Sequence, residues 1–232
     1  MTEAGLTAQP DRASLARTLA PVPSIAAAMD KATDSALRRV QELTAEALAV
    51  PGCGDPARLV IDAGRRAVRA AVAVYRGGGA MTDHDQIAWL AVTLADLRVR
   101  DDAWARMDPG FRLAHRQLWT DMVRRAPASY VPAPASLLAF TAWQSGDGAL
   151  ASVAIERALD ADPAYSMALL LAEALYCGLP PSAAALPMTP EEVAASYAGT
   201  PGRRGAAAAA GAAAPASRSR PGARRARSRP CG

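Results

Sequence analysis

Four charged residues near the middle of the chain, Arg98, Arg100, Asp101 and Asp102, form the densest group of basic and acidic side chains outside the C-terminal end. Arginine binds carboxylates and phosphates through paired N–H donors, so this group is our candidate site for an acidic ligand. The alternative is a junction between helices held by ion pairs, which are common at protein surfaces and contribute little individually. We favour the junction, and the group remains the best candidate for a ligand site.

Histidine lies next to carboxylates once, at Asp83, His84 and Asp85. These side chains are possible ligands of a hard metal ion, but acids are also expected at the N-terminal end of a helix, where they cap N–H groups and oppose the helix dipole. We therefore interpret them as caps. His115, the other histidine, is expected to pack or to point to solvent. The sequence predicts no metal site and no cofactor.

No catalytic arrangement is visible in the sequence. The glycine run 77–79 follows a predicted helix and lacks the pattern of a phosphate-binding loop, so it is interpreted as a helix end. With only two histidines, a hydrolytic triad has no recognisable motif. The tryptophans are expected in the core, where most large aromatic side chains lie. They are Trp89, Trp104, Trp119 and Trp143.

Helical spacing of apolar residues runs through most of the chain. Helices are predicted over residues 24–50, after a cap at Asp55 with Pro56 in its first turn, after Asp83 with buried positions continuing through Leu94 to Leu97, and after Asp108 with Phe111 facing inward. Shorter helices are predicted at 134–145, 149–161, 164–177 and 190–198, the last opened by Thr189 and Glu192. No segment alternates like a strand. The prediction is an all-α, irregular helical bundle.

One helical hairpin resembles a tetratricopeptide unit in its spacing. Small residues let its two helices approach, two larger apolar residues fill the seam, a glycine turn joins the helices, and a proline follows the second helix. The residues in question are Leu138, Gly146, Asp147, Ala151, Ile155, Ala158 and Pro163. A single unit of this kind cannot bury both faces, so neighbouring helices are expected to complete the core.

The C-terminal end differs in composition from the rest of the chain. Residues 201–232 hold eight of the 26 basic residues and no acidic residue, which leaves 18 basic against 22 acidic residues elsewhere. We expect a linker-like segment at 1–23, a helical domain at 24–198 and a disordered tail at 199–232 rich in Ala, Arg and Pro. Nucleic-acid binding is therefore expected only through this tail, if at all. The three cysteines suggest no disulfide framework, and a cytoplasmic protein without a membrane partner is predicted.

Several runs of sequence resemble domain of unknown function 4192, in order along the chain. They include LADLRVRD at 94–101, LAFTAWQSGDG at 138–148 and PAYSMALLLAEAL at 163–175. The resemblance extends over about 13–197. It implies no activity, and since members of this family are typically longer at the N-terminus, it implies an N-terminally shortened chain. The change of composition after 197 is what a shifted reading frame would produce, and a natural low-complexity linker would have the same composition.

The expected function is that of a non-catalytic helical module that binds an unknown protein partner, by analogy with tetratricopeptide-like hairpins. The alternative is an accessory helical half of an enzyme or ligand-binding protein whose active part precedes this segment.

Overall fold

The computed structural model describes residues 11–52, 54–184 and 189–197, and within them it confirms an all-α fold without strands. The tail expected at 199–232 lies outside the described residues. The helices, in chain order, are α1 (Arg12–Thr18), α2 (Ala26–Leu48), α3 (Arg58–Arg76), α4 (His84–Thr93), α5 (Leu97–Ala105), α6 (Arg112–Arg125), α7 (Pro132–Gln144), α8 (Gly148–Ala161), α9 (Ser166–Tyr176) and α10 (Pro190–Ser196). Short 3-10 turns occur at η1 (Pro23–Ile25), η2 (Pro109–Phe111), η3 (Ala128–Tyr130) and η4 (Pro181–Ala184).

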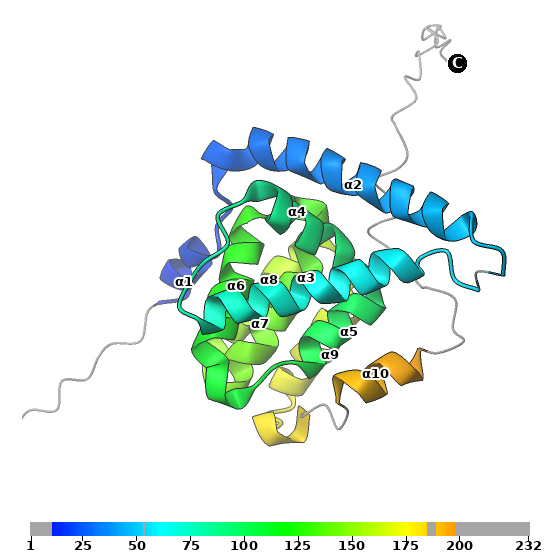
Figure 1. Cartoon of the computed structure of the whole chain (residues 1–232). Helices are drawn as coiled ribbons and strands as arrows, with labels where there is room; N and C mark the ends of the chain where they lie inside the picture. The colour runs from blue at the N-terminus through cyan, green and yellow to red at the C-terminus, as the bar shows by residue number, and fades with distance from the viewer. Residues whose placement is uncertain (1–10, 53, 185–188, 198–232) are drawn as a thin grey trace, which may run out of the picture.

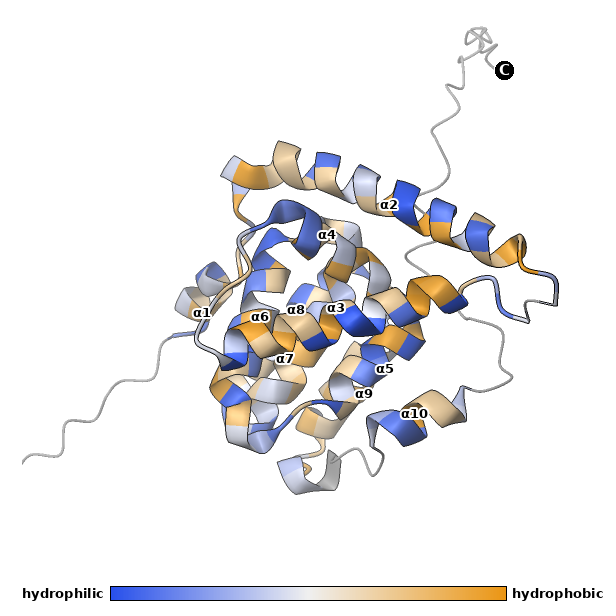
Figure 2. Ribbon diagram, viewed as in Figure 1, coloured by the Kyte–Doolittle hydropathy of each residue, from blue (hydrophilic) through white to orange (hydrophobic). Residues whose placement is uncertain are grey.

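Helix α7 is the centre of the fold. Every residue from Pro132 to Trp143 is buried, which fits a helix that is apolar on all sides. α6, α8 and α9 pack around it, while α2 crosses over α4 and α3 on the outside of the bundle (Figure 1). Figure 2 shows hydrophobic and hydrophilic residues alternating along α2, as expected for a helix with one buried face. A helix able to cross a bilayer does not occur in the described ranges.

The predicted hairpin is formed by α7 and α8. Gly146 has a φ of +78°, and the backbone N–H groups of Gly146 and Asp147 donate to Trp143 and Ala142, which closes the end of α7. The Asp147 side chain accepts from the N–H of Leu150 at 3.0 Å and so caps α8. The apolar hairpin side chains are buried and Pro163 is exposed just after α8. The buried ones are Leu138, Ala151, Ile155 and Ala158.

The prediction of one helix running from Asp83 through Leu97 is wrong. α4 ends at Thr93, and Asp96 begins α5 by accepting from the N–H of Arg98 at 2.9 Å. The apolar spacing continues across this break because both helices face the same core, so periodicity alone does not reveal the turn.

Two smaller predictions about helix starts also differ from the structure. Asp55 accepts from the N–H of Ala57, ahead of the start of α3 at Arg58, so it is not the predicted cap. We also expected Asp83 to form a capping box with Gln86, three residues later; Asp83 does cap α4, but through the N–H of Asp85. In both segments the aspartate side chain accepts from the N–H two residues further on, which is a tight side-chain turn.

Phe111, which was predicted to face inward, is 37% exposed. The chain after Asp108 first makes the turn η2, and α6 starts only at Arg112.

Within the segment expected to be linker-like, residues 12–18 form α1, which packs on α8 and carries an ion pair from Arg12 to Glu156. The capping box at Thr189 and Glu192 of α10 is confirmed.

Candidate functional site

Helix α5 carries the predicted charge group and lies between α3 and α10 (Figure 1). Its first residue with a charged side chain, Arg98, is buried and makes a paired contact with Asp96: Nε donates to Oδ1 at 3.0 Å and Nη2 to Oδ2 at 2.8 Å. Nη1 donates to Asp55 at 2.5 Å. The hydrogen bonds to Asp96 raise the pKa of Arg98 further. Its donors are therefore used inside the protein.

Arg100 and Asp101 face a different set of partners. Nε and Nη2 of Arg100 donate to Asp101, and the Arg100 guanidinium lies 5.8 Å from the centre of the Tyr165 ring. The Tyr197 hydroxyl, just after α10, donates to the other oxygen of Asp101. Burial, followed by this hydrogen bond, raises the pKa of Tyr197 to about 12. These contacts fasten α10 to α5.

Asp102 turns toward α3 and the end of α5. It accepts from Arg106 at 2.7 Å and 3.0 Å, and the Nε of Arg65 lies 4.0 Å away. The Asp102 side chain is only 3% exposed, so its charge is compensated within the protein. The predicted group is thus divided among three separate sets of partners, and its four side chains do not converge on one opening.

An open groove lies beside this ion-paired layer, between the C-terminal half of α3 and residues 106–111. It encloses about 660 Å³ and is lined by the charged side chains Arg69, Arg76, Arg106 and Asp108 and by the apolar side chains Val72 and Phe111. We call it the arginine groove. The sequence did not predict this groove, although Arg69 and Arg76 lie seven residues apart and so share a face of a predicted helix.

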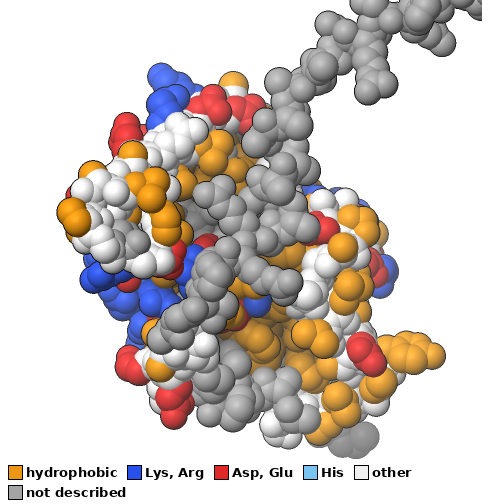
Figure 3. Space-filling view, turned by 90° about the vertical axis from the view of Figure 1, so that its right-hand side faces the viewer, with side chains coloured by type: hydrophobic (Ala, Val, Ile, Leu, Met, Phe, Trp, Pro, Cys, Tyr) orange, Lys and Arg blue, Asp and Glu red, His pale blue; other side chains and the backbone are white. Residues whose placement is uncertain are grey.

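The outer face of α9 is a second surface that the sequence did not predict. Leu170 is 64% exposed and Tyr176 is 92% exposed, and Leu169 and Leu179 are also exposed. We call these four residues the α9 face. Leu169 and Tyr176 share one side of the helix with Glu173, the only charged residue of α9, and Leu170 lies beside this side; Leu179 follows the end of the helix. Figure 3 shows hydrophobic side chains gathered on the lower right of the molecule. The signal was present in the run LLLAEAL, which is apolar on more sides than one neighbour can cover.

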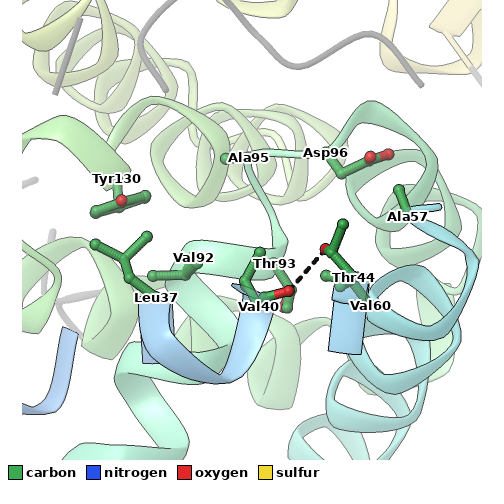
Figure 4. A pocket seen from close by; sticks show the side chains of 10 residues that line it. All are labelled: Leu37, Val40, Thr44, Ala57, Val60, Val92, Thr93, Ala95, Asp96 and Tyr130. Carbon is green, nitrogen blue, oxygen red and sulfur yellow. Dashed lines mark hydrogen bonds between the residues drawn. The ribbon is translucent and has the colours of Figure 1, made fainter. Parts of the chain in front are cut away.

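A small cavity lies between α2, α3 and α4 (Figure 4). It measures about 90 Å³ and is lined mainly by apolar side chains, among them Leu37, Val40 and Val92, with Tyr130 at one end. The hydroxyl of Thr44 at its wall donates to the carbonyl of Val40 at 2.7 Å. Ligand pockets usually measure about 300–1,000 Å³, so this space suits a few water molecules at most.

The other candidates from the sequence lie at helix ends or among packed side chains. His84 is the first residue of α4 beside its cap Asp83, and no three His, Cys, Asp or Glu side chains within the described ranges come close enough to hold a metal ion. His115 is buried, and its Nε2 accepts from the N–H of Asp108 at 3.3 Å. Gly77 ends α3. Among the tryptophans, Trp89, Trp119 and Trp143 are buried and Trp104 is partly buried against Phe140.

Comparison with known proteins gives one match. The family model described as domain of unknown function (DUF4192) matches residues 1–182, whereas we expected the resemblance to cover about 13–197. No curated protein and no solved structure matches the chain. The tetratricopeptide-like character of the α7–α8 hairpin therefore stays a prediction.

Proposed function

The chain belongs to the family described as domain of unknown function (DUF4192), and we propose that it acts as a non-catalytic helical interaction module in the cytoplasm. The observation that carries this proposal is the exposed α9 face. α7, α8 and α9 pack in sequence, and α9 is the last of the three. A terminal helix in a stack is expected to have a polar outer face, because it has no further neighbour.

α9 departs from that expectation. Leu169, Leu170 and Tyr176 are all exposed, with only Glu173 to interrupt them. Exposed apolar side chains that lie together usually mark a surface that another protein covers, and an exposed tyrosine is well suited to anchor such a contact. We propose that the partner places an apolar helix or strand against this face.

Site-specific crosslinking in the native host tests the proposal. A photoreactive amino acid at position 176 should give a discrete adduct with a different protein, and Leu170→Glu should abolish it, because a carboxylate in the contact would be desolvated. The same amino acid in place of Glu42, exposed on α2, is the control. Leu170 is exposed, so Leu170→Glu should leave the thermal unfolding of the chain unchanged.

The proposal fails under three results. No adduct at position 176, an adduct that Leu170→Glu does not weaken, or an adduct only between two copies of this chain would each contradict it. Adducts of equal yield from positions 42 and 176 would show nonspecific contact, which is also against it.

A further inference from the structure

The arginine groove has hydrogen-bond donors that the protein does not use. Arg69 is exposed and makes no ion pair within the described part of the chain. Arg76 has one long contact, 3.8 Å from Nη2 to Oδ2 of Asp108. The other oxygen of Asp108 accepts from the N–H of Gly110. Two cations on one face of α3 therefore retain free N–H donors.

Arg76 is also held in a fixed orientation. Its guanidinium lies over the Phe111 ring, 3.6 Å from the ring centre. Stacking of this kind leaves the N–H edge of the guanidinium open, so an anion can approach in the plane of the group. A donor that is already oriented loses less conformational entropy when a ligand binds. Phe111, whose exposure the sequence did not predict, thus positions Arg76.

The third arginine of the groove is engaged differently. Arg106 donates hydrogen bonds from Nε and Nη2 to Asp102. It therefore adds positive charge to the groove but few free donors. The charge of Glu191, near the start of α10, acts on Arg106 as well. Glu191 therefore reduces the positive potential of the groove, and an anionic ligand has to compete with it.

We propose that the arginine groove binds a small diphosphate, with one phosphate on Arg69 and the other on Arg76. Seven residues of helix separate the two arginines by roughly 10 Å along α3, so the side chains must reach toward a ligand that both of them bind. A diphosphate offers one charged group to Arg76, which Phe111 holds in place, and a second to Arg69, whose long side chain is free to reach toward it. The groove volume of about 660 Å³ admits a nucleoside diphosphate, whose flat base can lie against the apolar wall of Val72 and Phe111.

Calorimetric titration of the whole chain tests this site, with pyrophosphate, ADP, citrate and adenosine as separate probes. Pyrophosphate and ADP should bind, ADP more tightly, while adenosine and citrate should bind at least tenfold more weakly than ADP. Arg69→Gln and Arg76→Gln should each weaken ADP binding at least fivefold. Glu191→Gln should strengthen it about twofold, because it removes the competing charge.

Arg38→Gln is the matched control, since Arg38 is an exposed arginine on another helix, α2. It should leave ADP binding unchanged. The proposal is overturned if no diphosphate binds, if citrate binds as well as ADP, or if Arg38→Gln weakens binding as much as Arg69→Gln does. These results do not depend on the α9 face, so this site and the proposed function can fail separately.

Discussion

Gly64 of α3 lies directly against Thr93 of α4: a Cβ atom built on Gly64 would be 2.8 Å from the Cβ of Thr93. It would also lie 3.0 Å from a methyl group of Val99 on α5. Both neighbours are β-branched and stiff, so they cannot swing away easily. Helices α3, α4 and α5 therefore meet at a point where only glycine fits.

Gly64→Ala should destabilise the fold for this reason. Alanine favours a helix over glycine by about 1 kcal/mol, but overpacking costs about 1–3 kcal/mol, and the contact below 3 Å makes overpacking dominate. Urea unfolding measures the difference. Gly148→Ala is the control, because a Cβ at Gly148 has open space around it and should not lower stability.

Asp96→Ala should cost about 2–4 kcal/mol, because it removes both the cap of α5 and the paired acceptor of the buried Arg98. Asp96→Asn retains an acceptor for the N–H of Arg98 but loses the charge, so an intermediate loss is expected. Urea unfolding of both variants gives the comparison. An equally small effect of both substitutions would show that α5 does not depend on this contact.

Asp147→Ala should lower the free energy of unfolding by about 1 kcal/mol, the usual value of a helix cap, since it leaves the Leu150 N–H without its acceptor. Asp147→Asn keeps the cap and loses only the ion pair with the half-exposed Arg116, so it should be nearly neutral. Thermal unfolding separates the two variants. If Asn is as harmful as Ala, the charge and not the cap is what stabilises the hairpin.

Tyr75 should ionise late in an alkaline titration. Burial, followed by its 2.5 Å hydrogen bond to Asp121, raises its pKa from 10.0 to about 12. The unfolded chain releases this proton at lower pH than the folded chain does. The contribution of neutral Tyr75 to the free energy of unfolding is therefore complete below pH 10 and is lost as the pH rises toward 12. Absorbance at the tyrosinate band should rise in a late step that is smaller in Tyr75→Phe. An unchanged late step would exclude Tyr75.

His115 should make the fold sensitive to acid. Burial, followed by the charge of Arg76, lowers its pKa, and its Nε2 must stay unprotonated to accept from the N–H of Asp108. The unfolded state binds the proton first as the pH falls below the ordinary value of 6.5, so stability is present above that pH and lost below it. Urea midpoints at pH 8 and pH 5.5 should differ more for the wild type than for His115→Gln.

The sequence predicted those parts of the fold that depend on local signals. The ends and starts of some helices are set by the chemistry of single residues. Gly146 lies at the end of α7, Asp147 caps the start of α8, and the Thr189–Glu192 box opens α10. The break at Asp96 was not predicted, because an aspartate within an apolar period looks the same in the middle of a helix as at its start.

The candidate site was harder to predict, because pairing between distant residues decides it. Arg98 and Arg100 stand close together in sequence, but Asp55 and Tyr165 determine that they point to separate partners. Arg76 gains its orientation from Phe111, which ends a turn that periodicity does not reveal. Spacing along one helix can suggest such surfaces, but only tertiary contacts show which charges remain free.

The burial of α7 on all sides has a kinetic meaning. Because α7 is covered on all sides, its backbone amides reach solvent only when the surrounding helices separate. Hydrogen exchange in Pro132–Gln144 should therefore proceed through global opening. Amides of α10, which the hydrogen bond from Tyr197 to Asp101 holds against α5, should exchange much sooner through local detachment. The exchange rates of the slowest amides of α7 would thus report how often the whole bundle opens.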